Sequence, residues 1–461
     1  MGMVSMLCVS IAEETVEGMT RRAEEAFARG AEAVEFRVDL MGMANETAVN
    51  RLAGIKGKKI LTLKGKTIHL SHLPSSGAFN YVDIDLNDYL VLKPSIRSHQ
   101  NLILSTHAPI DGRAARQRIR SALRFGAIAK CVITRNGYDA CASVMRVSSS
   151  LRSQRVIAFS LGEKGVLSRI KSLRDGAPVS YCALSKAATV APGQLTLEEM
   201  RAAAKGLLLG ILGSKRATDH SLSPYLQEKL LHLSHLAGIY LRFPCETAEL
   251  TKFLACAKLA GVNGFNVTMP LKQIIVRHIR FGDETAKEIG AVNTVVRTGT
   301  GWSGFNTDAA AIKEVVSKLR VKSALILGAG GAARAAACVL SDRHVAVLGR
   351  REERRRELIR RFGLSMERPG GHYDMLINCT PIGMTHGDRL PQELTACSFG
   401  HVINMVYRPV SNPFLLLAKR NGAGYTDGIE LLLRQAIHSF RLWTGKHVPY
   451  GKVSNMLEDL L

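Results

Sequence analysis

The stretch Ser323–Arg334, SALILGAGGAAR, decides the fold of the second half of the chain. Its first residues form a short apolar run, which is typical of a strand buried on both faces. Gly328, Gly330 and Gly331 then permit a tight turn, and Ala332–Leu340 has the composition of a helix that opens directly after it. The unpaired N–H groups and the dipole at such a helix start attract phosphate. The stretch therefore predicts a strand–turn–helix unit that binds a phosphorylated ligand, with a glycine-rich turn in some other α/β protein as the alternative.

A second apolar run, His344–Leu348, follows this helix and ends at Gly349, Arg350 and Arg351. In a dinucleotide-binding fold the end of the second strand meets the adenosine ribose, where an acidic residue would accept from a 2′-hydroxyl. Arginine instead suits a 2′-phosphate, because its guanidinium matches phosphate geometry. The order of strand, glycine turn, helix, strand and arginine favours a dinucleotide site, and it predicts NADP(H) as the cofactor.

Length and composition limit the class of protein. A chain of 461 residues predicts two or three domains, and 46% hydrophobic with 22% charged residues is typical of a soluble globular protein. No apolar run is long enough to cross a bilayer, and the first residues lack the layout of a signal peptide, so we expect a cytoplasmic protein without a membrane partner. The nine cysteines are scattered without a CxxC pair. This pattern favours small buried hydrophobes and predicts neither disulfides nor a metal site.

The chain carries a net charge of +23, which alone could indicate nucleic-acid binding. Residues 1–208 hold 29 basic and 18 acidic groups and the remainder holds 33 and 21, so the excess is spread evenly. Attraction of small anionic substrates or of a phosphorylated cofactor explains such a distribution as well. We therefore expect small anionic ligands and no nucleic-acid partner, while the sequence leaves the oligomeric state undetermined.

Apolar runs recur along the first two hundred residues, and amphipathic segments separate most of them. The runs are Val4–Ile11, Ala33–Val38, Lys59–Leu63, Tyr81–Leu86, Asn101–Thr106, Ala127–Ile133, Arg155–Leu161 and Val179–Leu184. Eight strands that alternate with helices predict a (β/α)8 barrel over residues 1–208. We expect the last barrel helix at Leu195–Leu208 and a new strand directly after it.

Polar side chains lie where the predicted strands end, which is where a barrel carries its chemistry. Glu35 and Arg37 close the second strand, Lys64 the third and His107 the fifth, whereas Lys130 lies within an otherwise apolar strand. One interpretation of Lys130 is a lysine that extends from the barrel rim into solvent. The other is an amine kept neutral by burial and by cationic neighbours, and therefore able to attack a ketone.

This half of the chain resembles type I 3-dehydroquinate dehydratase. The matching motifs are EFRVD (35–39), LILSTH (102–107), the strand bearing Lys130, GVLSR (165–169) and APGQ (191–194). The resemblance implies that Lys130 forms an iminium with the substrate ketone. It also implies that His107 removes the proton from the adjacent carbon and returns one to the departing hydroxyl. The substrate-binding residues would be Ser10, Glu35, Arg37, Lys64, Arg169 and Gln194.

Three departures from that family concern substrate affinity and leave the catalytic pair unchanged. Lys64 stands where the family usually has arginine, so a bidentate fork is lost. The acidic-Gly-Gly run expected after it is missing, and Val190 replaces a binding serine.

From residue 209 onward the residues that could carry chemistry fall in loops. HSLSP (220–224) offers two hydroxyls before a helix start, and GFNVTMPLK (264–272) ends in a lysine. IGAVNT (289–294) and GFNTD (304–308) each present an Asn–Thr pair at a strand end. Taken singly, these motifs indicate helix caps and turns, with Asp308 capping the next helix.

In this order, before a dinucleotide unit, the motifs resemble shikimate dehydrogenase, and the resemblance runs from about residue 209 to the C-terminus. Later matches are GAGGAAR (328–334), INCTPIGM (377–384), MVYRP (405–409) and DGIELLLRQAIHSFRLWTG (427–445). The resemblance implies that Lys272 and Asp308 flank the reacting oxygen, where an ammonium can stabilise and protonate a nascent alkoxide. The substrate-binding residues would be Ser221, Ser223, Thr268, Asn293, Tyr407 and Gln435.

The same resemblance implies three groups of cofactor-binding residues. Gly328, Ala329, Gly330, Gly331 and Ala332 would hold the pyrophosphate, Arg350 and Arg354 the 2′-phosphate, and Thr380, Met405 and Gly428 the nicotinamide side. Departures from the family pattern are Gly349 for asparagine, Ala311 for glycine, Asn404 for aspartate and Gln227–Glu228 for His-Asn. None of them removes a proposed reacting group.

We therefore expect an α/β chain with a barrel at 1–208, a shikimate-binding domain at 209–308 and 430–461, and a Rossmann-like NADP-binding domain at 309–429. Since the product of the first predicted activity is the substrate of the second, the sequence predicts a bifunctional shikimate-pathway enzyme, both lyase and oxidoreductase. It would dehydrate 3-dehydroquinate to 3-dehydroshikimate and reduce that to shikimate with NADPH. The alternatives are a metabolite-binding regulator with weakened catalysis, or a dehydrogenase that prefers quinate or NAD.

Overall fold

The computed structural model describes residues 5–41, 45–65, 77–92, 101–151, 155–299, 301–365, 370–407, 409 and 412–455. Val4 of the first predicted strand and Arg408 of the MVYRP motif lie outside the described residues. The chain divides into two compact units. Unit 1 comprises Met1–Leu208, Ala237–Ile239 and Ala248–Val262, and unit 2 comprises Leu209–Leu236, Tyr240–Thr247 and Asn263–Leu461.

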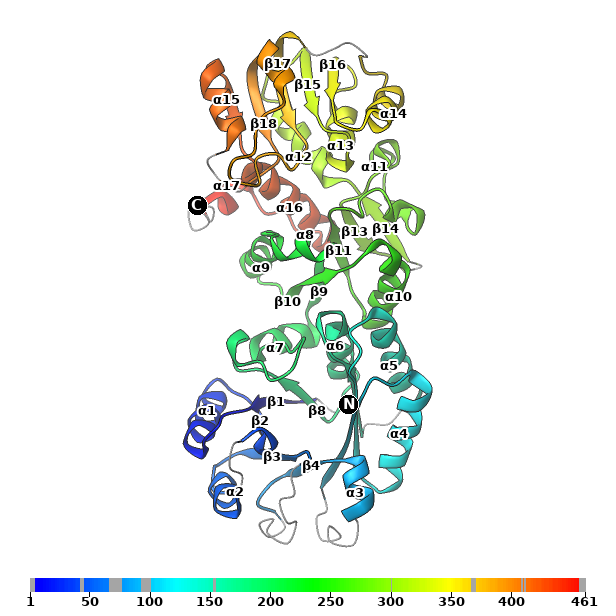
Figure 1. The fold of residues 1–461 in the computed structure, drawn as a ribbon, viewed down its shortest axis with the longest axis vertical. Helices are drawn as coiled ribbons and strands as arrows, with labels where there is room; N and C mark the ends of the chain where they lie inside the picture. Colours follow the sequence, from blue (N-terminus) through cyan, green and yellow to red (C-terminus); the bar gives the residue numbers. More distant parts are fainter. Residues whose placement is uncertain are drawn as a thin grey trace. The chain divides into compact units, whose positions relative to one another are not determined.

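Unit 1 is built on an eight-stranded parallel sheet with the strand order β7-β6-β5-β4-β3-β2-β1-β8 (Figure 1). The strands are β1 Met6–Ile11, β2 Ala33–Phe36, β3 Lys58–Leu63, β4 Tyr81–Asp85, β5 Leu102–Ala108, β6 Ile128–Ile133, β7 Val156–Ser160 and β8 Val179–Cys182. Each predicted strand is present, with ends shifted by a residue or two. Within the described residues, each strand is hydrogen-bonded to the next from β7 around to β8. The ladder between β7 and β8, which would close the barrel, is missing among these residues.

Helices follow most of these strands. They are α1 Val16–Ala28, α2 Glu46–Ala53, α3 Leu86–Leu92, α4 Gly112–Arg124, α5 Tyr138–Leu151, α6 Val166–Arg174 and α7 Leu197–Lys205, and unit 1 also contains α10 Leu250–Ala260. The predicted helix end at Leu208 is wrong, because Gly206 already has extended backbone angles and β9 begins at Leu207.

The barrel interior begins with an apolar layer. Its strand residues include Cys8, Ala33, Ile60, Ile103, Ile128, Ile157 and Val179, and Tyr81 packs against them. Alternate residues of a strand share one face. The residues two positions further along each strand therefore form the next layer toward the carboxyl ends.

Unit 2 contains a six-stranded mixed sheet with the order β10-β9-β11-β13-β14-β12. Its strands are β9 Leu207–Gly213, β10 Gly238–Pro244, β11 Gly264–Val267, β12 Arg280–Phe281, β13 Thr294–Arg297 and β14 Trp302–Phe305. The accompanying helices are α8 Lys215–Asp219, α9 Ser223–Leu233, α11 Glu284–Ile289 and α12 Thr307–Val316. The strand β11 pairs in parallel with β9 and antiparallel with β13, so the ends of β11 and β14 deliver their loops to one region.

A five-stranded parallel sheet with the order β16-β15-β17-β18-β19 follows. Its strands are β15 Ser323–Leu327, β16 His344–Leu348, β17 Gly371–Asn378, β18 Cys397–Asn404 and β19 Gly424–Thr426. Its helices are α13 Gly331–Leu340, α14 Glu352–Phe362 and α15 Pro413–Asn421, and α16 Gly428–Thr444 and α17 Tyr450–Ser454 end the described chain. An isolated parallel bridge from Ala346 to Ser365 continues the sheet beyond β16. The strand order therefore reverses between β15 and β17, which is where such folds bind ligands.

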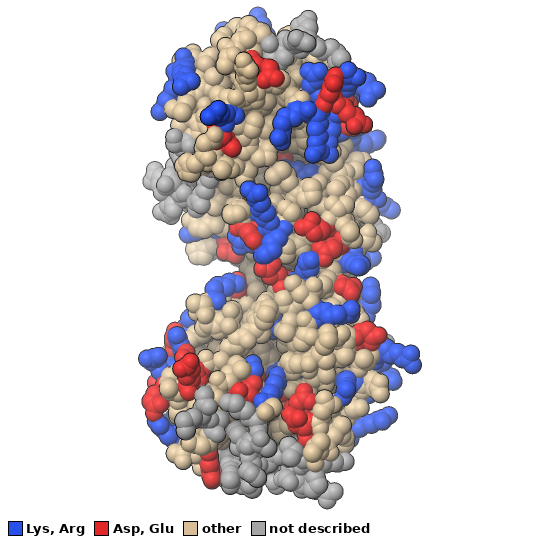
Figure 2. All heavy atoms as spheres, viewed as in Figure 1, with Lys and Arg blue, Asp and Glu red and all other residues tan. Residues whose placement is uncertain are grey.

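Basic side chains are spread over the face shown in Figure 2 and gather over α14. Among the described residues, no helix combines the length and the hydropathy that crossing a membrane requires. All nine cysteines are free thiols, and seven of them are buried, as expected for small hydrophobes.

Candidate functional sites

A polar layer lines the inside of unit 1, one step along the strands from the apolar layer. Its members are Ser10, Glu35, Thr62, Asp83, Ser105 and Lys130. All six side chains are buried. Ionised groups in such a place must be paired, because burial without a partner is costly. This layer is therefore the candidate site of unit 1.

The Lys130 ammonium lies between two carboxylates of this layer. Nζ donates to Asp83 Oδ2 at 2.6 Å and to Glu35 Oε1 at 3.4 Å. It also lies 3.8 Å from the centroid of the Tyr181 ring, a cation–π contact. Because Lys130 is only 5% exposed, the interpretation of a rim lysine reaching into solvent is wrong.

The charges around Lys130 differ from those expected. Burial lowers the pKa of Lys130, but Asp83 and Glu35 outweigh burial and raise that pKa above its ordinary value. The prediction that cationic neighbours keep the amine neutral is therefore wrong for the chain without substrate. Asp83 Oδ2, at 2.6 Å, is the nearer of the two carboxylate acceptors of this amine.

Hydrogen bonds fix Glu35 from several strands. Ser10 Oγ donates to its Oε2 at 2.6 Å, and Thr62 Oγ1 donates to its Oε1 at 2.8 Å. Gln194 extends the network by donating from Nε2 to Ser10 Oγ at 3.3 Å. Burial raises the pKa of Glu35, but the nearby cations, Lys130 first, outweigh burial and bring it to about 2. Glu35 therefore stays ionised.

Lys64 and His107 form a second pair at the carboxyl ends of their strands. Lys64 Nζ lies 2.8 Å from His107 Nε2 and 3.2 Å from Nδ1. His107 lies two residues beyond Ser105, the register partner of Lys130. The strand period therefore puts His107 on the inward side one layer above the amine.

The two predicted arginines have different surroundings. Arg37 forks onto Asp39, with Nε 2.9 Å from Oδ1 and Nη2 2.7 Å from Oδ2. The Arg169 guanidinium lies 4.1 Å from the centroid of the Phe159 ring and donates to the Pro192 carbonyl at 3.5 Å. Its buried Nε has no hydrogen-bond partner among the described residues, and burial lowers the pKa of Arg169 to about 10. Arg169 thus has one buried N–H without a partner among the described residues, whereas a carboxylate already occupies Arg37.

Sequence reasoning missed Asp83, Thr62 and Tyr181. A signal for Asp83 was present, since it stands between Val82 and Ile84 in a short barrel strand. An acid between two apolar residues of such a strand faces the interior, where it needs a cation. Lys130, in a similarly apolar strand, is that cation.

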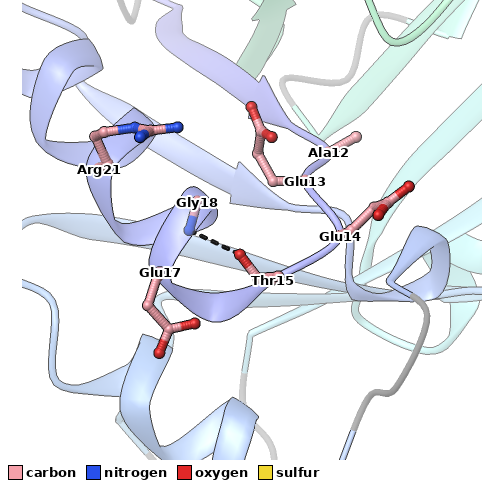
Figure 3. A pocket seen from close by; sticks show the side chains of 7 residues that line it. All are labelled: Ala12, Glu13, Glu14, Thr15, Glu17, Gly18 and Arg21. Carbon is pink, nitrogen blue, oxygen red and sulfur yellow. Dashed lines mark hydrogen bonds between the residues drawn. The ribbon is translucent and has the colours of Figure 1, made fainter.

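A hollow of about 590 Å³ lies beside the start of α1 (Figure 3). Its lining residues are Ala12, Glu13, Glu14, Thr15, Glu17, Gly18 and Arg21. Thr15 Oγ1 accepts from the Gly18 N–H there and caps the helix. None of the predicted site residues lines this hollow, so the polar layer stays the candidate site.

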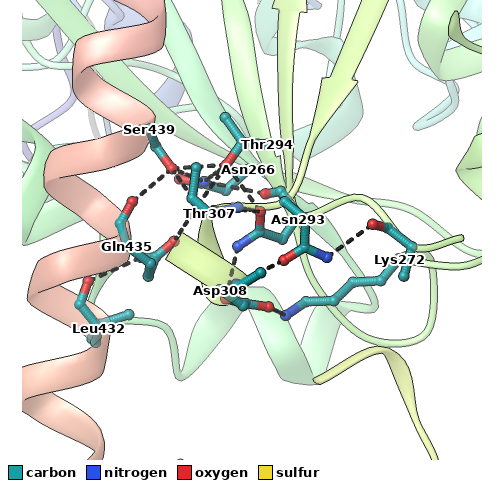
Figure 4. Close-up of polar contacts among 12 residues, drawn as sticks. Asn266, Lys272, Asn293, Thr294, Thr307, Asp308, Leu432, Gln435 and Ser439 are labelled. Carbon is teal, nitrogen blue, oxygen red and sulfur yellow. Dashed lines mark hydrogen bonds and ion pairs between the residues drawn. The ribbon is translucent and has the colours of Figure 1, made fainter. Parts of the chain in front are cut away.

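In unit 2 the candidate site centres on Lys272 and Asp308. Lys272 Nζ donates to Asp308 Oδ2 at 2.5 Å, and Asn293 Nδ2 donates to Asp308 Oδ1 at 2.7 Å (Figure 4). The three residues come from the loop after β11, the residue before β13 and the first turn of α12. Two donors thus hold the carboxylate while the ammonium keeps N–H groups for a substrate oxygen.

Asp308 is free for this role because Asn306 caps α12. The Asn306 side chain accepts from the Ala309 N–H, and Asn293 Oδ1 accepts from the Thr307 N–H at 2.7 Å. The interpretation of Asp308 as a helix cap is therefore wrong.

A buried hydrogen-bond network holds Asn293 in place, and sequence reasoning missed most of its members. Asn266 Nδ2 donates to the Asn293 carbonyl at 3.2 Å and to Ser439 Oγ at 2.9 Å. The Tyr240 hydroxyl donates to Asn266 Oδ1 at 2.7 Å. Gln435 lies one turn before Ser439 on α16, and its backbone carbonyl accepts from Ser439 Oγ at 2.9 Å (Figure 4). The returning helix thereby joins the site.

The other predicted substrate residues lie on neighbouring loops. Ser221 Oγ accepts from the Ser223 N–H at 3.1 Å, and both serines are buried at the start of α9. The Thr268 N–H donates to the Leu212 carbonyl at 2.8 Å directly after β11. The Tyr407 hydroxyl lies 3.4 Å from the His220 carbonyl oxygen, beside the serine motif.

The glycine turn fits a dinucleotide. Gly328 has φ +118°, and a Cβ there would lie 3.1 Å from Thr380 Cγ2, so the loops after β15 and β17 meet at the switch point. No atom lies within 4 Å of a Cβ built at Gly330, whereas one built at Gly331 would lie 3.2 Å from Lys272 Cβ. The turn is open beside Ala329 and Ala332, which are partly exposed. A phosphate at this helix start would therefore bring its nucleotide close to Lys272.

The remaining cofactor candidates lie around this turn. Arg350 and Arg354 are exposed, and within the described part of the chain neither forms an ion pair. A Cβ at Gly428 would lie 2.8 Å from the Met405 carbonyl oxygen, so these two residues are adjacent. Unpaired arginines beyond β16 fit a 2′-phosphate.

The two units thus define two kinds of domain: a parallel barrel with a buried lysine amine, and a dinucleotide-binding fold with a lysine–aspartate pair. The chain belongs to the shikimate dehydrogenase family, and residues 7–207 match the family model for type I 3-dehydroquinase. Residues 214–295 match the shikimate dehydrogenase substrate binding domain, and residues 428–455 match the shikimate 5'-dehydrogenase C-terminal domain.

Relatives and solved structures agree with this assignment. Shikimate dehydrogenase (NADP(+)) of Aquifex aeolicus (strain VF5) is 34% identical over 264 residues, which cover 55% of this chain and 97% of that protein. Its counterpart from Archaeoglobus fulgidus is 36% identical over 53% of this chain and 95% of its own length. The Thermus thermophilus structure in complex with NADP(H) and shikimate is 32% identical, covers 55% of this chain and all of its own, and has a TM-score of 0.50. The expected fold class and family are therefore confirmed.

Proposed function

We propose that this chain catalyses two consecutive reactions, dehydration of 3-dehydroquinate to 3-dehydroshikimate and NADPH-dependent reduction of 3-dehydroshikimate to shikimate. One observation carries the proposal. Each unit holds a lysine amine paired with an aspartate at its polar site, Lys130 at 2.6 Å from Asp83 and Lys272 at 2.5 Å from Asp308. The domain limits proposed for these activities are 1–208, then 209–308 with 430–461, and 309–429.

In the first reaction the Lys130 amine attacks the substrate ketone after giving its proton to a base, and Asp83 lies within reach. Loss of water from the adduct gives an iminium, which acidifies the adjacent carbon. His107 takes the proton from that carbon and then returns one to the departing hydroxyl, which leaves as water. Hydrolysis of the iminium frees the product and the amine. Glu35, Ser10, Gln194 and Arg169 bind the substrate around this carbon skeleton.

In the second reaction NADPH supplies a hydride to the ketone carbon when it is bound. Lys272 donates a hydrogen bond to the carbonyl oxygen and protonates it as negative charge develops. Asp308 orients that ammonium, and Asn293 orients Asp308. The serines Ser221 and Ser223 bind the substrate carboxylate, while the other substrate contacts come from Thr268, Tyr407 and Gln435.

For the cofactor, the glycine turn Gly328–Ala332 holds the pyrophosphate and Arg350 with Arg354 holds the 2′-phosphate. Thr380, Met405 and Gly428 line the nicotinamide side. The relatives named as NADP(+) enzymes support this assignment over an enzyme that prefers quinate or NAD.

A coupled assay tests both halves at once. The purified chain, given 3-dehydroquinate and NADPH alone, is expected to oxidise NADPH and form shikimate. The Lys130→Met variant is expected to leave 3-dehydroquinate unconverted but still to reduce added 3-dehydroshikimate. Lys272→Met is expected to accumulate 3-dehydroshikimate, with reduction about 10²- to 10⁴-fold slower. Exposed Lys58→Met and Lys313→Met serve as matched controls in the two units.

Borohydride separates the proposed covalent step from simple binding. Reduction in the presence of 3-dehydroquinate is expected to leave the substrate skeleton on Lys130 as a stable secondary amine, detected by peptide mass. An active chain whose Lys130 stays unmodified would overturn the iminium route, and a chain that consumes neither substrate would overturn the enzymatic proposal in favour of a binding protein.

A further inference from the structure

The histidine proposed as the proton carrier has a lysine as its partner. Lys64 Nζ lies 2.8 Å from His107 Nε2 and 3.2 Å from Nδ1. Among the described residues, no carboxylate lies within hydrogen-bond distance of this ring. The nearest negative charges, Asp83 and Glu35, are already bound to Lys130.

Among the described residues, four charged groups act most strongly on His107. The cations are Lys64 after β3 and Lys130 on β6, and the carboxylates are Asp83 on β4 and Glu35 on β2. Crowding by protein atoms and the two cations lower the pKa of His107 well below its usual value, although the residue is exposed. Crowding and Lys130 lower the pKa of Lys64 to about 8. The directions of the two pKa shifts, together with the short Nζ-to-ring distances, favour a neutral ring beside a charged lysine near neutral pH.

We propose that Lys64 is a positioning residue that sets the acidity of His107, an inference that rests on the proposed dehydration. Its ammonium donates to the neutral ring and disfavours a second positive charge there. When the ring takes the proton from the substrate carbon, the imidazolium beside Lys64 is a stronger acid than an ordinary imidazolium, so it passes that proton more readily to the departing hydroxyl. The proton moves from carbon to nitrogen to oxygen, and Lys64 itself neither gains nor loses one.

Substrate binding is expected to change the position of the Lys64 ammonium. The Lys64 ammonium lies within 3.2 Å of both ring nitrogens. A substrate carboxylate attracts the ammonium and draws it away from the ring nitrogens, while the positive charge stays close. A lysine suits this exchange because its single flexible ammonium can turn between two acceptors, whereas an arginine fork is fixed.

The direct test is the titration of His107 in the full chain without substrate. With ¹⁵N-labelled histidine, the His107 signal is identified by its loss in His107→Gln. We expect the wild-type ring to stay neutral well below its ordinary pKa of about 6.5. Lys64→Met is expected to move its midpoint toward that value by about one pH unit or more, a tenfold change in proton concentration. Lys64→Arg keeps the charge and is expected to leave the midpoint low, as is the exposed control Lys58→Met.

Kinetics give the second readout. The acid limb of kcat/KM for dehydration is expected to move to higher pH in Lys64→Met and to stay in place in Lys64→Arg. If Lys64→Met raises only KM and leaves that limb unmoved, Lys64 binds substrate and the inference is wrong. A wild-type ring that titrates near 6.5 overturns it without any variant. A wild-type chain that forms no 3-dehydroshikimate refutes the proposed function instead, and the titration still decides on the pair.

Discussion

Lys130 shows how one buried residue depends on its immediate partners. Its ammonium is stable in the barrel because Asp83 and Glu35 face it, and both carboxylates are almost inaccessible to water. Removing one partner of such a group leaves an uncompensated buried charge. The same pairing sets how readily the amine loses its proton, so Asp83 links folding of the site to its reactivity.

The variant Asp83→Asn tests that link. Without this carboxylate, burial dominates at Lys130 and the pKa of the amine falls, so the neutral nucleophile forms at lower pH. We expect the pH midpoint for borohydride trapping of 3-dehydroquinate, followed by intact mass, to fall relative to the wild-type chain. Asp175→Asn, an exposed residue of unit 1, is the control. A midpoint that stays or rises would show that Asp83 does not hold the charge of Lys130.

Arg350 carries a prediction about cofactor choice. A hydrogen bond to a charged group contributes roughly 1.5–3 kcal/mol, and each 1.4 kcal/mol is a factor of about ten in affinity. Arg350→Ala is therefore expected to raise KM for NADPH about 10- to 100-fold and to leave KM for NADH nearly unchanged. Arg360→Ala, another exposed arginine of the same run, is expected to change neither. Equal effects on both cofactors would contradict a 2′-phosphate contact.

At the scale of elements, the strands of the barrel and of the dinucleotide unit could be predicted because each is a short apolar run between polar helices. The glycine turn and β16 could also be predicted, since Gly328, Gly330 and Arg350 follow the order that is typical of a dinucleotide-binding unit. Register could not be predicted from one strand alone. Asp83 is the register partner of Ile103, whereas Lys130 is the partner of Ser105, two residues further along β5, so their contact depends on the tilt of the strands in the barrel.

Other features of the site could not be predicted from the sequence, because neighbouring residues of similar type could fill the same local role. Asp308 and Asn306 are both good helix caps by residue type, and the choice between them depends on Lys272 and Asn293, which arrive from other loops. Arg37 lies two residues from Asp39, so its guanidinium has a nearby acceptor whatever the substrate does. The partners of Asp308 follow from the tertiary fold and cannot be read from local spacing, whereas the Arg37–Asp39 pair is local and could have been predicted.

The helix α7 offers a test of one element. Thr196 accepts from the Glu199 N–H, and the Glu199 side chain accepts from the Thr196 N–H, which forms a capping box. Thr196→Ala is expected to cost about 1 kcal/mol of unfolding free energy in unit 1. Urea unfolding of the full chain, followed by far-UV circular dichroism and residual dehydratase activity, measures this cost. Thr196→Ser keeps the capping hydroxyl and is expected to retain most of the unfolding free energy that Thr196→Ala loses. Equal losses of unfolding free energy in both variants would assign the effect to packing.

At the scale of the whole molecule, each amine draws its described partners from its own unit. Lys130 contacts Asp83, Glu35 and Tyr181 in unit 1, and Lys272 contacts Asp308 in unit 2. Among the described residues, the printed partners of both amines are therefore consistent with two sites that work independently. Loss of one site should leave the other at full rate, and the intermediate can travel between chains.

Mixing two inactive variants tests this independence. Lys130→Met and Lys272→Met, each unable to convert 3-dehydroquinate to shikimate alone, are expected to restore that conversion when combined. The wild-type-like unit 1 of one chain releases 3-dehydroshikimate, and unit 2 of the other chain reduces it. NADPH oxidation should show a lag that shortens as protein concentration rises, because the free intermediate must first accumulate. A mixture that releases 3-dehydroshikimate but does not reduce it, while Lys130→Met alone reduces added 3-dehydroshikimate, would contradict exchange through solution. If Lys130→Met alone fails that reduction, the two sites are coupled and independence is wrong.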